Sequence, residues 1–146
     1  MTAKHLILIA AGGSAALLLG AWAFQLAGYA PCQMCLWQRW PHGAAIVIGI
    51  LAYAQPMLAW AGGAAAATSG GIGVYHTGVE RGWWDGPASC SGGGDLLSGD
   101  LLSTEIAPVV MCDEVVWQFA GLSMASWNAI LSLGLAGLWV IAARRT

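Results

Sequence analysis

The stretch PCQMCLWQR, residues 31–39, separates two long runs of sequence that carry no charged side chain. Residues 6–30 precede it and residues 40–79 follow it, and Arg39 carries the only charge of the stretch itself. A helix needs about 20 apolar residues to cross a hydrocarbon core of about 30 Å. The first run is therefore long enough for one membrane crossing, and the second run is long enough for two.

The dipeptide Gln55-Pro56, near the middle of the second run, is the expected turn between these two crossings. Proline disfavours helical geometry in the residue before it, so a helix is expected to end there. A helix that began only after Arg39 would be too short to cross, because each residue adds about 1.5 Å. We therefore expect the second crossing at 35–54, with Cys35 in its first turn at the membrane surface.

The composition indicates an integral membrane protein. Of the 146 residues, 58% are apolar and 8% are charged, against about 25% charged residues in soluble domains. The mean hydropathy is +0.69. A cleaved signal peptide is the alternative for the first span, but its apolar segment usually has about 7–15 residues and this one is longer. We predict an all-α integral membrane four-helix bundle in one domain, 1–146. The expected spans are 6–27, 35–54, 57–79 and 124–143, with a long non-cytoplasmic loop at 80–123.

Small residues recur every four positions along the third expected span, as at Gly62, Ala66 and Gly70. This spacing favours close contact between helices in a membrane, because small side chains let two backbones approach. A general bias towards alanine and glycine is the alternative explanation of the pattern.

The charged residues indicate the orientation of the chain. All seven acids fall within residues 80–114, which contain one base, Arg81, so that this segment has a net charge of −6 and cannot lie in hydrocarbon. Four spans would place both termini on one side of the membrane. The bases on that side are Lys4, Arg144 and Arg145, and those on the opposite side are Arg39 and Arg81. This small excess of bases predicts cytoplasmic termini.

This topology places Cys32, Cys35, Cys90 and Cys112 together on the non-cytoplasmic side, where disulfides persist. Structural zinc would require a second closely spaced pair, and covalent haem would require histidine after Cys35. Two disulfide pairs, Cys32–Cys35 and Cys90–Cys112, fit the spacing better. A structural bridge is a fair interpretation of the loop pair, but a bridge that closes so short a loop as the first pair constrains little of the unfolded chain.

A redox-active Cys-x-x-Cys at the membrane surface needs an electron acceptor, and a quinone is the obvious lipid-soluble one. Arg39 could donate hydrogen bonds to a quinone oxygen. His76, near the end of the third span on the same side, could be a second donor or an ordinary interfacial histidine. Two other classes remain open at this point: a membrane protein whose cysteines only cross-link its outer loop, and a metal-binding membrane protein. No basic patch indicates nucleic acid as a partner.

These residues together resemble a known family. The motif CxxCxxxR at 32–39 lies between two spans, His76 lies near the end of the third, and a separated cysteine pair precedes the fourth. This arrangement resembles the DsbB family, and the run CDEVVWQFAGLSMASWN at 112–128 resembles its shorter-looped α-proteobacterial members. The chain departs from the family in its acidic, glycine-rich loop and in Gln38, where other members can carry an acid. The related vitamin K epoxide reductases place the Cys-x-x-Cys after the loop pair, and the reverse order here favours DsbB.

The resemblance implies a dithiol:quinone oxidoreductase of the bacterial inner membrane. Such a protein reoxidises a periplasmic thiol oxidase similar to DsbA and passes the electrons to ubiquinone or menaquinone, so that disulfides are made de novo. The resemblance implies that Cys90 is attacked by the reduced partner and that Cys112 passes electrons to Cys32. Cys35 is then released as a thiolate and reduces the quinone. The implied quinone-binding residues are Arg39 and His76.

Overall fold

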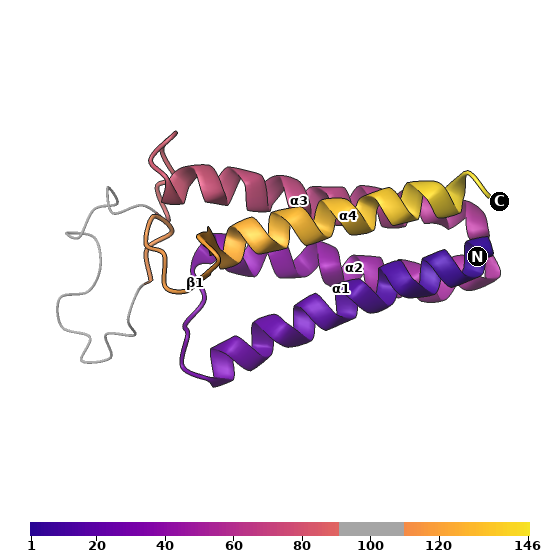
Figure 1. The fold of residues 1–146 in the computed structure, drawn as a ribbon, viewed down its shortest axis with the longest axis horizontal. Helices are drawn as coiled ribbons and strands as arrows, with labels where there is room; N and C mark the ends of the chain where they lie inside the picture. The colour runs from indigo at the N-terminus through magenta and orange to yellow at the C-terminus, as the bar shows by residue number, and fades with distance from the viewer. Residues whose placement is uncertain (91–109) are drawn as a thin grey trace.

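Four long helices account for most of the fold in the computed structural model, which describes residues 1–90 and 110–146. They run side by side along the long dimension of the molecule (Figure 1). Each packs against its neighbour in sequence, and the first also packs against the last. The helices are α1 (Ala3–Leu26), α2 (Gln33–Ala54), α3 (Ala59–Glu80) and α4 (Met124–Ala143), with a short 3-10 turn at Pro56–Leu58 and a two-stranded antiparallel ribbon of β1 (Gln118–Phe119) and β2 (Leu122–Ser123).

Side chains at the helix starts explain where two of the helices begin. The sulfur of Cys32 accepts a hydrogen bond from the backbone N–H of Cys35 at 3.3 Å, so α2 begins at Gln33 and Cys35 lies in its first turn. The hydroxyl of Ser123 caps α4 in the same way, accepting from the backbone N–H of Ser126 at 3.1 Å. Such caps satisfy donors that have no partner inside the helix. The first cysteine is therefore a part of the helix start as well as a thiol.

Glycines allow α3 and α4 to approach at the level of their backbones. A Cβ atom added at Gly62 would overlap the ring of Trp139. One added at Gly73 would lie 3.0 Å from the backbone nitrogen of Ala129 and 3.1 Å from its Cα. By contrast, a Cβ atom at Gly71 would meet nothing within 4 Å. One face of α3 is thus fitted closely to α4.

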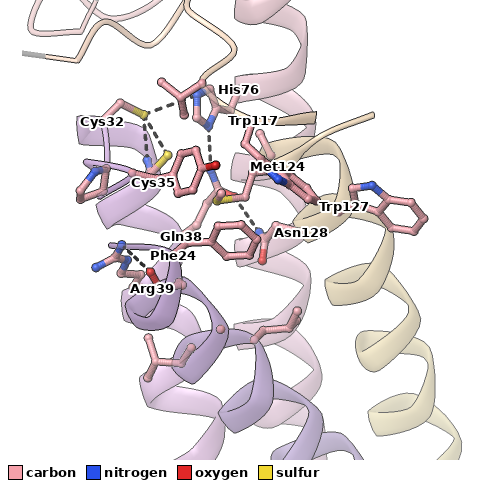
Figure 2. Close-up of a pocket in the computed structure, with 18 of the residues that line it drawn as sticks. Phe24, Cys32, Cys35, Gln38, Arg39, His76, Trp117, Met124, Trp127 and Asn128 are labelled. Carbon is pink, nitrogen blue, oxygen red and sulfur yellow. Dashed lines mark hydrogen bonds between the residues drawn. The ribbon is translucent and has the colours of Figure 1, made fainter. Parts of the chain in front are cut away.

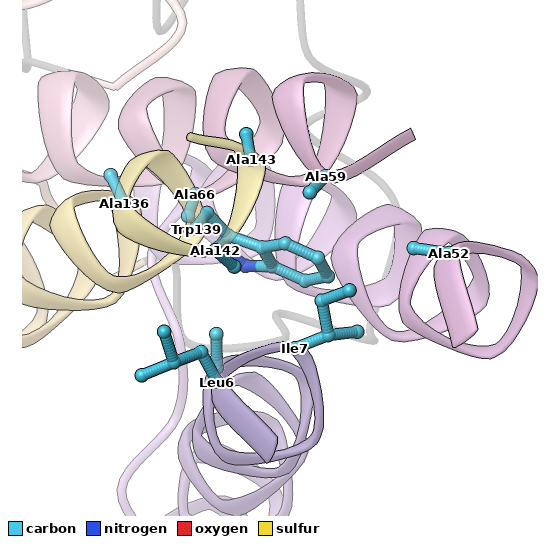
Figure 3. Close-up of a cluster of buried hydrophobic side chains, with 10 residues drawn as sticks. Leu6, Ile7, Ala52, Ala59, Ala66, Ala136, Trp139, Ala142 and Ala143 are labelled. Carbon is cyan, nitrogen blue, oxygen red and sulfur yellow. The ribbon is translucent and has the colours of Figure 1, made fainter. Parts of the chain in front are cut away.

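The ends of the chain lie together at one end of the helices, opposite the ribbon (Figure 1). A guanidinium nitrogen of Arg145 donates to the backbone oxygen of Met1 at 2.8 Å. Here the fully buried ring of Trp139 is surrounded by small and branched side chains from all four helices (Figure 3). This cluster holds the helices together at the end where the termini lie.

Several polar side chains are buried and many large apolar ones are exposed, which is the reverse of the pattern expected in water. Ser69 and Ser132 have no exposed surface, whereas Leu19, Ile50 and Met57 are more than half exposed. Among the described helices, α1 and α4 are long and apolar enough to cross a membrane. The other two helices are less apolar, because α2 carries polar side chains and α3 is rich in glycine. An apolar outer surface is what contact with lipid requires.

Candidate active site

The two cysteine pairs meet at the end of the helices that lies opposite the termini. Cys90 and Cys112 form a disulfide, and both are packed in one buried cluster with Cys32. Cys35 packs against this cluster and is half-buried. The sulfurs of Cys32 and Cys112 and a ring nitrogen of His76 all lie within 4.8 Å of one another. Residues that are far apart in sequence therefore bring the sulfur atoms of both pairs together next to one histidine.

The thiols of Cys32 and Cys35 are free in this structure, and their sulfurs lie 3.1 Å apart (Figure 2). The hydrogen bond from the Cys35 thiol, and then the one from His76, lower the pKa of Cys32 from 9.0 to about 4, although burial acts in the opposite direction. Cys32 is therefore a thiolate at neutral pH, next to a disulfide sulfur. A thiolate in that position is able to exchange with the disulfide.

His76 connects the thiols to a polar network inside the helices. Its Nε2 atom lies 3.5 Å from the sulfur of Cys32 and 3.8 Å from a carboxylate oxygen of Glu80. Its Nδ1 atom lies 2.9 Å from the side-chain nitrogen of Gln38. Figure 2 shows the ring between the two contacts. The histidine thus faces the sulfur of Cys32 on one side and the side chain of Gln38, on α2, on the other.

The network continues across three helices. The amide nitrogen of Asn128 donates to the side-chain oxygen of Gln38 at 2.7 Å, and Nε2 of His42 lies 3.0 Å from the Asn128 oxygen. The hydroxyl of Ser69 donates to the backbone oxygen of Gln38 at 3.0 Å. None of these partners was predicted to have a role from the sequence. Their signal was available, because Gln38 and His42 are one helical turn apart within an expected membrane span, where polar groups are by default functional candidates.

Cys32, His76 and Cys112 also have the atom types and spacing of a metal site. Two features argue against a resident metal ion. The sulfur of Cys112 is bonded to Cys90. A metal-binding imidazole usually donates its other N–H to an acceptor, whereas the group next to the second nitrogen of His76 is the amide nitrogen of Gln38, a donor. These contacts suit thiol chemistry better than metal binding.

A cavity of about 420 Å³ adjoins the Cys-x-x-Cys pair. It is lined by the second half of α1, the first turns of α2, the end of α3, the start of α4 and the segment that leads into β1. Cys35 and Arg39 lie on its α2 side, and aromatic rings form much of the rest of its wall (Figure 2). The aromatic residues are Phe24, Tyr29, Trp117, Phe119 and Trp127. An apolar cavity with few polar groups is typical of sites for small organic ligands.

Arg39 lines this cavity but its described hydrogen bonds run to α1. One guanidinium nitrogen donates to the side-chain oxygen of Gln25 at 2.7 Å, and another donates to the backbone oxygen of Ala21 at 3.4 Å. Sequence spacing placed Arg39 one helical turn after Cys35, and it could not reveal the contact with Gln25. The guanidinium is therefore held in place at the wall of the cavity between two helices.

Comparison with known proteins identifies the family. A family model described as "Disulfide bond formation protein DsbB" matches residues 3–142. The chain belongs to the DsbB family. It is 33% identical over 129 aligned positions to a disulfide bond formation protein B of Xanthomonas oryzae pv. oryzae, covering 80% of this chain and 74% of the relative. A disulfide bond formation protein B 2 of Pseudomonas aeruginosa is 32% identical over 149 aligned positions, covering 93% of this chain and 86% of the relative. No solved structure matches the chain.

Membership confirms the resemblance inferred from the CxxCxxxR motif and the separated loop pair. Together with the mostly helical fold, the apolar outer surface and the Cys90–Cys112 disulfide, it indicates a membrane protein concerned with disulfide bonds. Part of the expected redox loop, residues 91–109, lies outside the described residues.

Proposed function

We propose that this DsbB-family chain is a dithiol:quinone oxidoreductase that reoxidises a periplasmic thiol oxidase similar to DsbA. The observation that supports this most is the meeting of the two cysteine pairs beside an aromatic cavity. In bacteria, a relay from DsbA through DsbB to quinone keeps the periplasm oxidising. A chain with two adjacent pairs can receive electrons at one pair and deliver them from the other.

The proposed electron path uses the cysteines in a fixed order. A thiolate of the reduced partner attacks Cys90, and the bond between Cys90 and Cys112 breaks as a mixed disulfide forms. The Cys112 thiolate then attacks Cys32 of an oxidised Cys32–Cys35 pair, and Cys35 leaves as a thiolate beside the cavity. The distance of at most 4.8 Å between the sulfurs of Cys112 and Cys32 supports this step, because little movement brings them into contact.

The cavity is the proposed quinone site. A bound quinone accepts two electrons and two protons, and the chain must hold it next to Cys35. Arg39 is the stronger candidate for binding a quinone oxygen, because its guanidinium has five N–H donors and the contacts with Gln25 and Ala21 use two of them. His76 also lines the cavity, but its nitrogens are directed towards Gln38 and Cys32.

The proposed location is the bacterial inner membrane, with four spans in one domain and the thiols on the periplasmic side. The termini lie together at the end opposite the ribbon, and the cysteine cluster lies at the start of α2, away from them. That end carries Lys4 and Arg145, as expected of a cytoplasmic surface. We take the spans as 6–27, 35–54, 57–79 and 124–143, with the segment 80–123 outside.

The test is a quinone-reduction assay on purified chain in detergent, with a reduced DsbA-like protein as the electron donor and a soluble ubiquinone or menaquinone analogue as the acceptor. We expect quinol to form in proportion to partner disulfide, and we expect both products to be lost in Cys35→Ser and in Cys90→Ser. Arg81→Lys is the control, since Arg81 is a base that is outside the cavity lining. Partner oxidation at the wild-type rate in Cys90→Ser, or no quinol from the wild-type chain, would refute the proposal and favour cysteines that only cross-link the loop.

A further inference from the structure

The orientation of the Gln38 side chain is fixed by its neighbours. Its amide nitrogen lies 3.2 Å from the backbone oxygen of Met34, which can only accept a hydrogen bond. Its amide oxygen lies 2.7 Å from the amide nitrogen of Asn128. That nitrogen also faces the backbone oxygen of Ser69 at 3.5 Å, so Asn128 is oriented by a second carbonyl. Reversing either amide would place oxygen against oxygen in a buried site.

This orientation determines which nitrogen of His76 carries the proton. The amide nitrogen of Gln38 donates to Nδ1, which must then be the acceptor nitrogen of the ring. In a neutral imidazole the other nitrogen is the donor. Nε2 faces the sulfur of Cys32 at 3.5 Å and a carboxylate oxygen of Glu80 at 3.8 Å, both of which are acceptors when ionised. The contacts with Gln38, Cys32 and Glu80 therefore agree on one tautomer.

We propose that Gln38 is a positioning residue, which holds His76 in the tautomer whose Nε2–H donates a hydrogen bond to the sulfur of Cys32. The inference rests on the proposed function, and it assigns this hydrogen bond to one step of the proposed electron path. The second thiolate of the partner attacks the partner's own sulfur in the mixed disulfide, so that the oxidised partner leaves and Cys90 is released as a thiolate. The Cys90 thiolate then attacks Cys112 in a Cys32–Cys112 disulfide. The Cys90–Cys112 bond forms, the Cys32–Cys112 bond breaks, and Cys32 leaves with the electron pair as a thiolate, which Nε2–H stabilises.

The structure has the covalent arrangement that this step produces. Cys90 and Cys112 are bonded, and Cys32 is free and lies within hydrogen-bond reach of His76. The step needs no outside oxidant, because one disulfide is exchanged for another. Gln38 touches neither disulfide in this scheme and acts only through His76.

A chain with Cys35→Ser isolates this exchange from quinone and from the partner. Three cysteines remain, and they can form either the Cys90–Cys112 bond with Cys32 free or the Cys32–Cys112 bond with Cys90 free. Serine keeps a hydroxyl next to Cys32. The ratio of the two forms can be measured by acid quenching, alkylation and peptide mapping of the purified chain in detergent.

In this background we expect Gln38→Met to shift the ratio towards the Cys32–Cys112 form by about tenfold or more, as loss of a hydrogen bond to a charged group requires. Ser132→Ala is the matched control, since Ser132 bonds to Asn128 and His42 at the far end of the same network. Adding Gln38→Met to a His76→Ala chain should cause no further shift, because the effect passes through the ring.

Nitrogen NMR of histidine-labelled chain, with the His76 signals assigned from His76→Gln, reads the tautomer directly. We expect the Nε2–H form in the wild-type chain. The Nδ1–H form would overturn the inference, even if Gln38→Met failed to fold. An unchanged ratio in Gln38→Met, or an equal shift in Ser132→Ala, would also overturn it. If the expected ratio and tautomer were found in a chain that reduces no quinone, the positioning role would stand and the proposed function would fall.

Discussion

Replacing Gly73 by alanine should force α3 away from α4 at the level of the polar network. The new Cβ atom would lie 3.0 Å from the backbone nitrogen of Ala129, 3.1 Å from its Cα and 3.1 Å from the backbone oxygen of Ala125. Backbone atoms cannot rotate away as a side chain can, so the helices themselves must shift. Overpacking of this kind typically costs about 1–3 kcal/mol.

Gly71→Ala provides the comparison that isolates this cost. Gly71 lies in the same helix and its added Cβ would meet nothing within 4 Å. Both variants gain about 0.5–1 kcal/mol of helix preference over glycine, so the difference between them reports the contact with α4. We expect Gly73→Ala to be the less stable variant by about 1–3 kcal/mol in the free energy of unfolding, measured by denaturant titration in mixed micelles with helical circular dichroism as the signal. Equal stability of the two variants would refute the close contact between the two backbones.

Three further outcomes are expected. The pKa of Cys32 is lowered to about 4, so in protein with a reduced Cys32–Cys35 pair the thiolate absorbance should persist as the pH falls from about 8 to 5. It should disappear only below about pH 4. Loss of the absorbance near pH 8, where ordinary thiols titrate, would contradict the assignment. Arg39→Lys should keep the fold but raise the apparent KM for quinone, because lysine lacks the planar guanidinium group that can bind a quinone oxygen. The expected loss of binding free energy is about 1–3 kcal/mol. Quinone kinetics like those of the wild type would show that Arg39 only anchors the helix. In intact cells, a membrane-impermeant thiol reagent should reach Cys90 after reduction and should spare a Gln55→Cys probe, and the opposite pattern would reverse the proposed topology.

The family and the helical class could be predicted correctly from the sequence, because both depend on local patterns. The charge-free runs, the Gln55-Pro56 turn and the CxxCxxxR motif are each visible within a few tens of residues. The role of Cys32 at the start of α2 was not predicted, because its sulfur caps the helix and sulfur is an uncommon cap. The rule that prefers Ser, Thr, Asp and Asn at that position gives it no weight.

The partners of the site residues could not be predicted in the same way. The bond between Gln38 and Asn128 joins residues 90 positions apart. It depends on how α2 and α4 are rotated about their axes and on the close approach that the glycines of α3 allow. Likewise, Arg39 was recognised as a candidate from its spacing to Cys35, but its bond to Gln25 depends on the position of α1. Spacing along one helix reveals candidates, whereas contacts between helices decide what they touch.

The two sides of the cavity are held differently, and this affects how a reactant would reach it. α3 and α4 are in backbone contact, whereas α1 diverges from the other helices towards Leu26 and is tied to α2 there through Arg39 (Figure 1). The α1 side of the cavity, formed by residues such as Leu17 and Phe24, would lie within the bilayer if α1 crosses the membrane as proposed. A lipid-soluble reactant would arrive by diffusion in the plane of the bilayer. The occupancy of the cavity would then follow the mole fraction of the reactant in the lipid or detergent phase. Adding detergent at constant total quinone should therefore weaken the apparent binding of quinone.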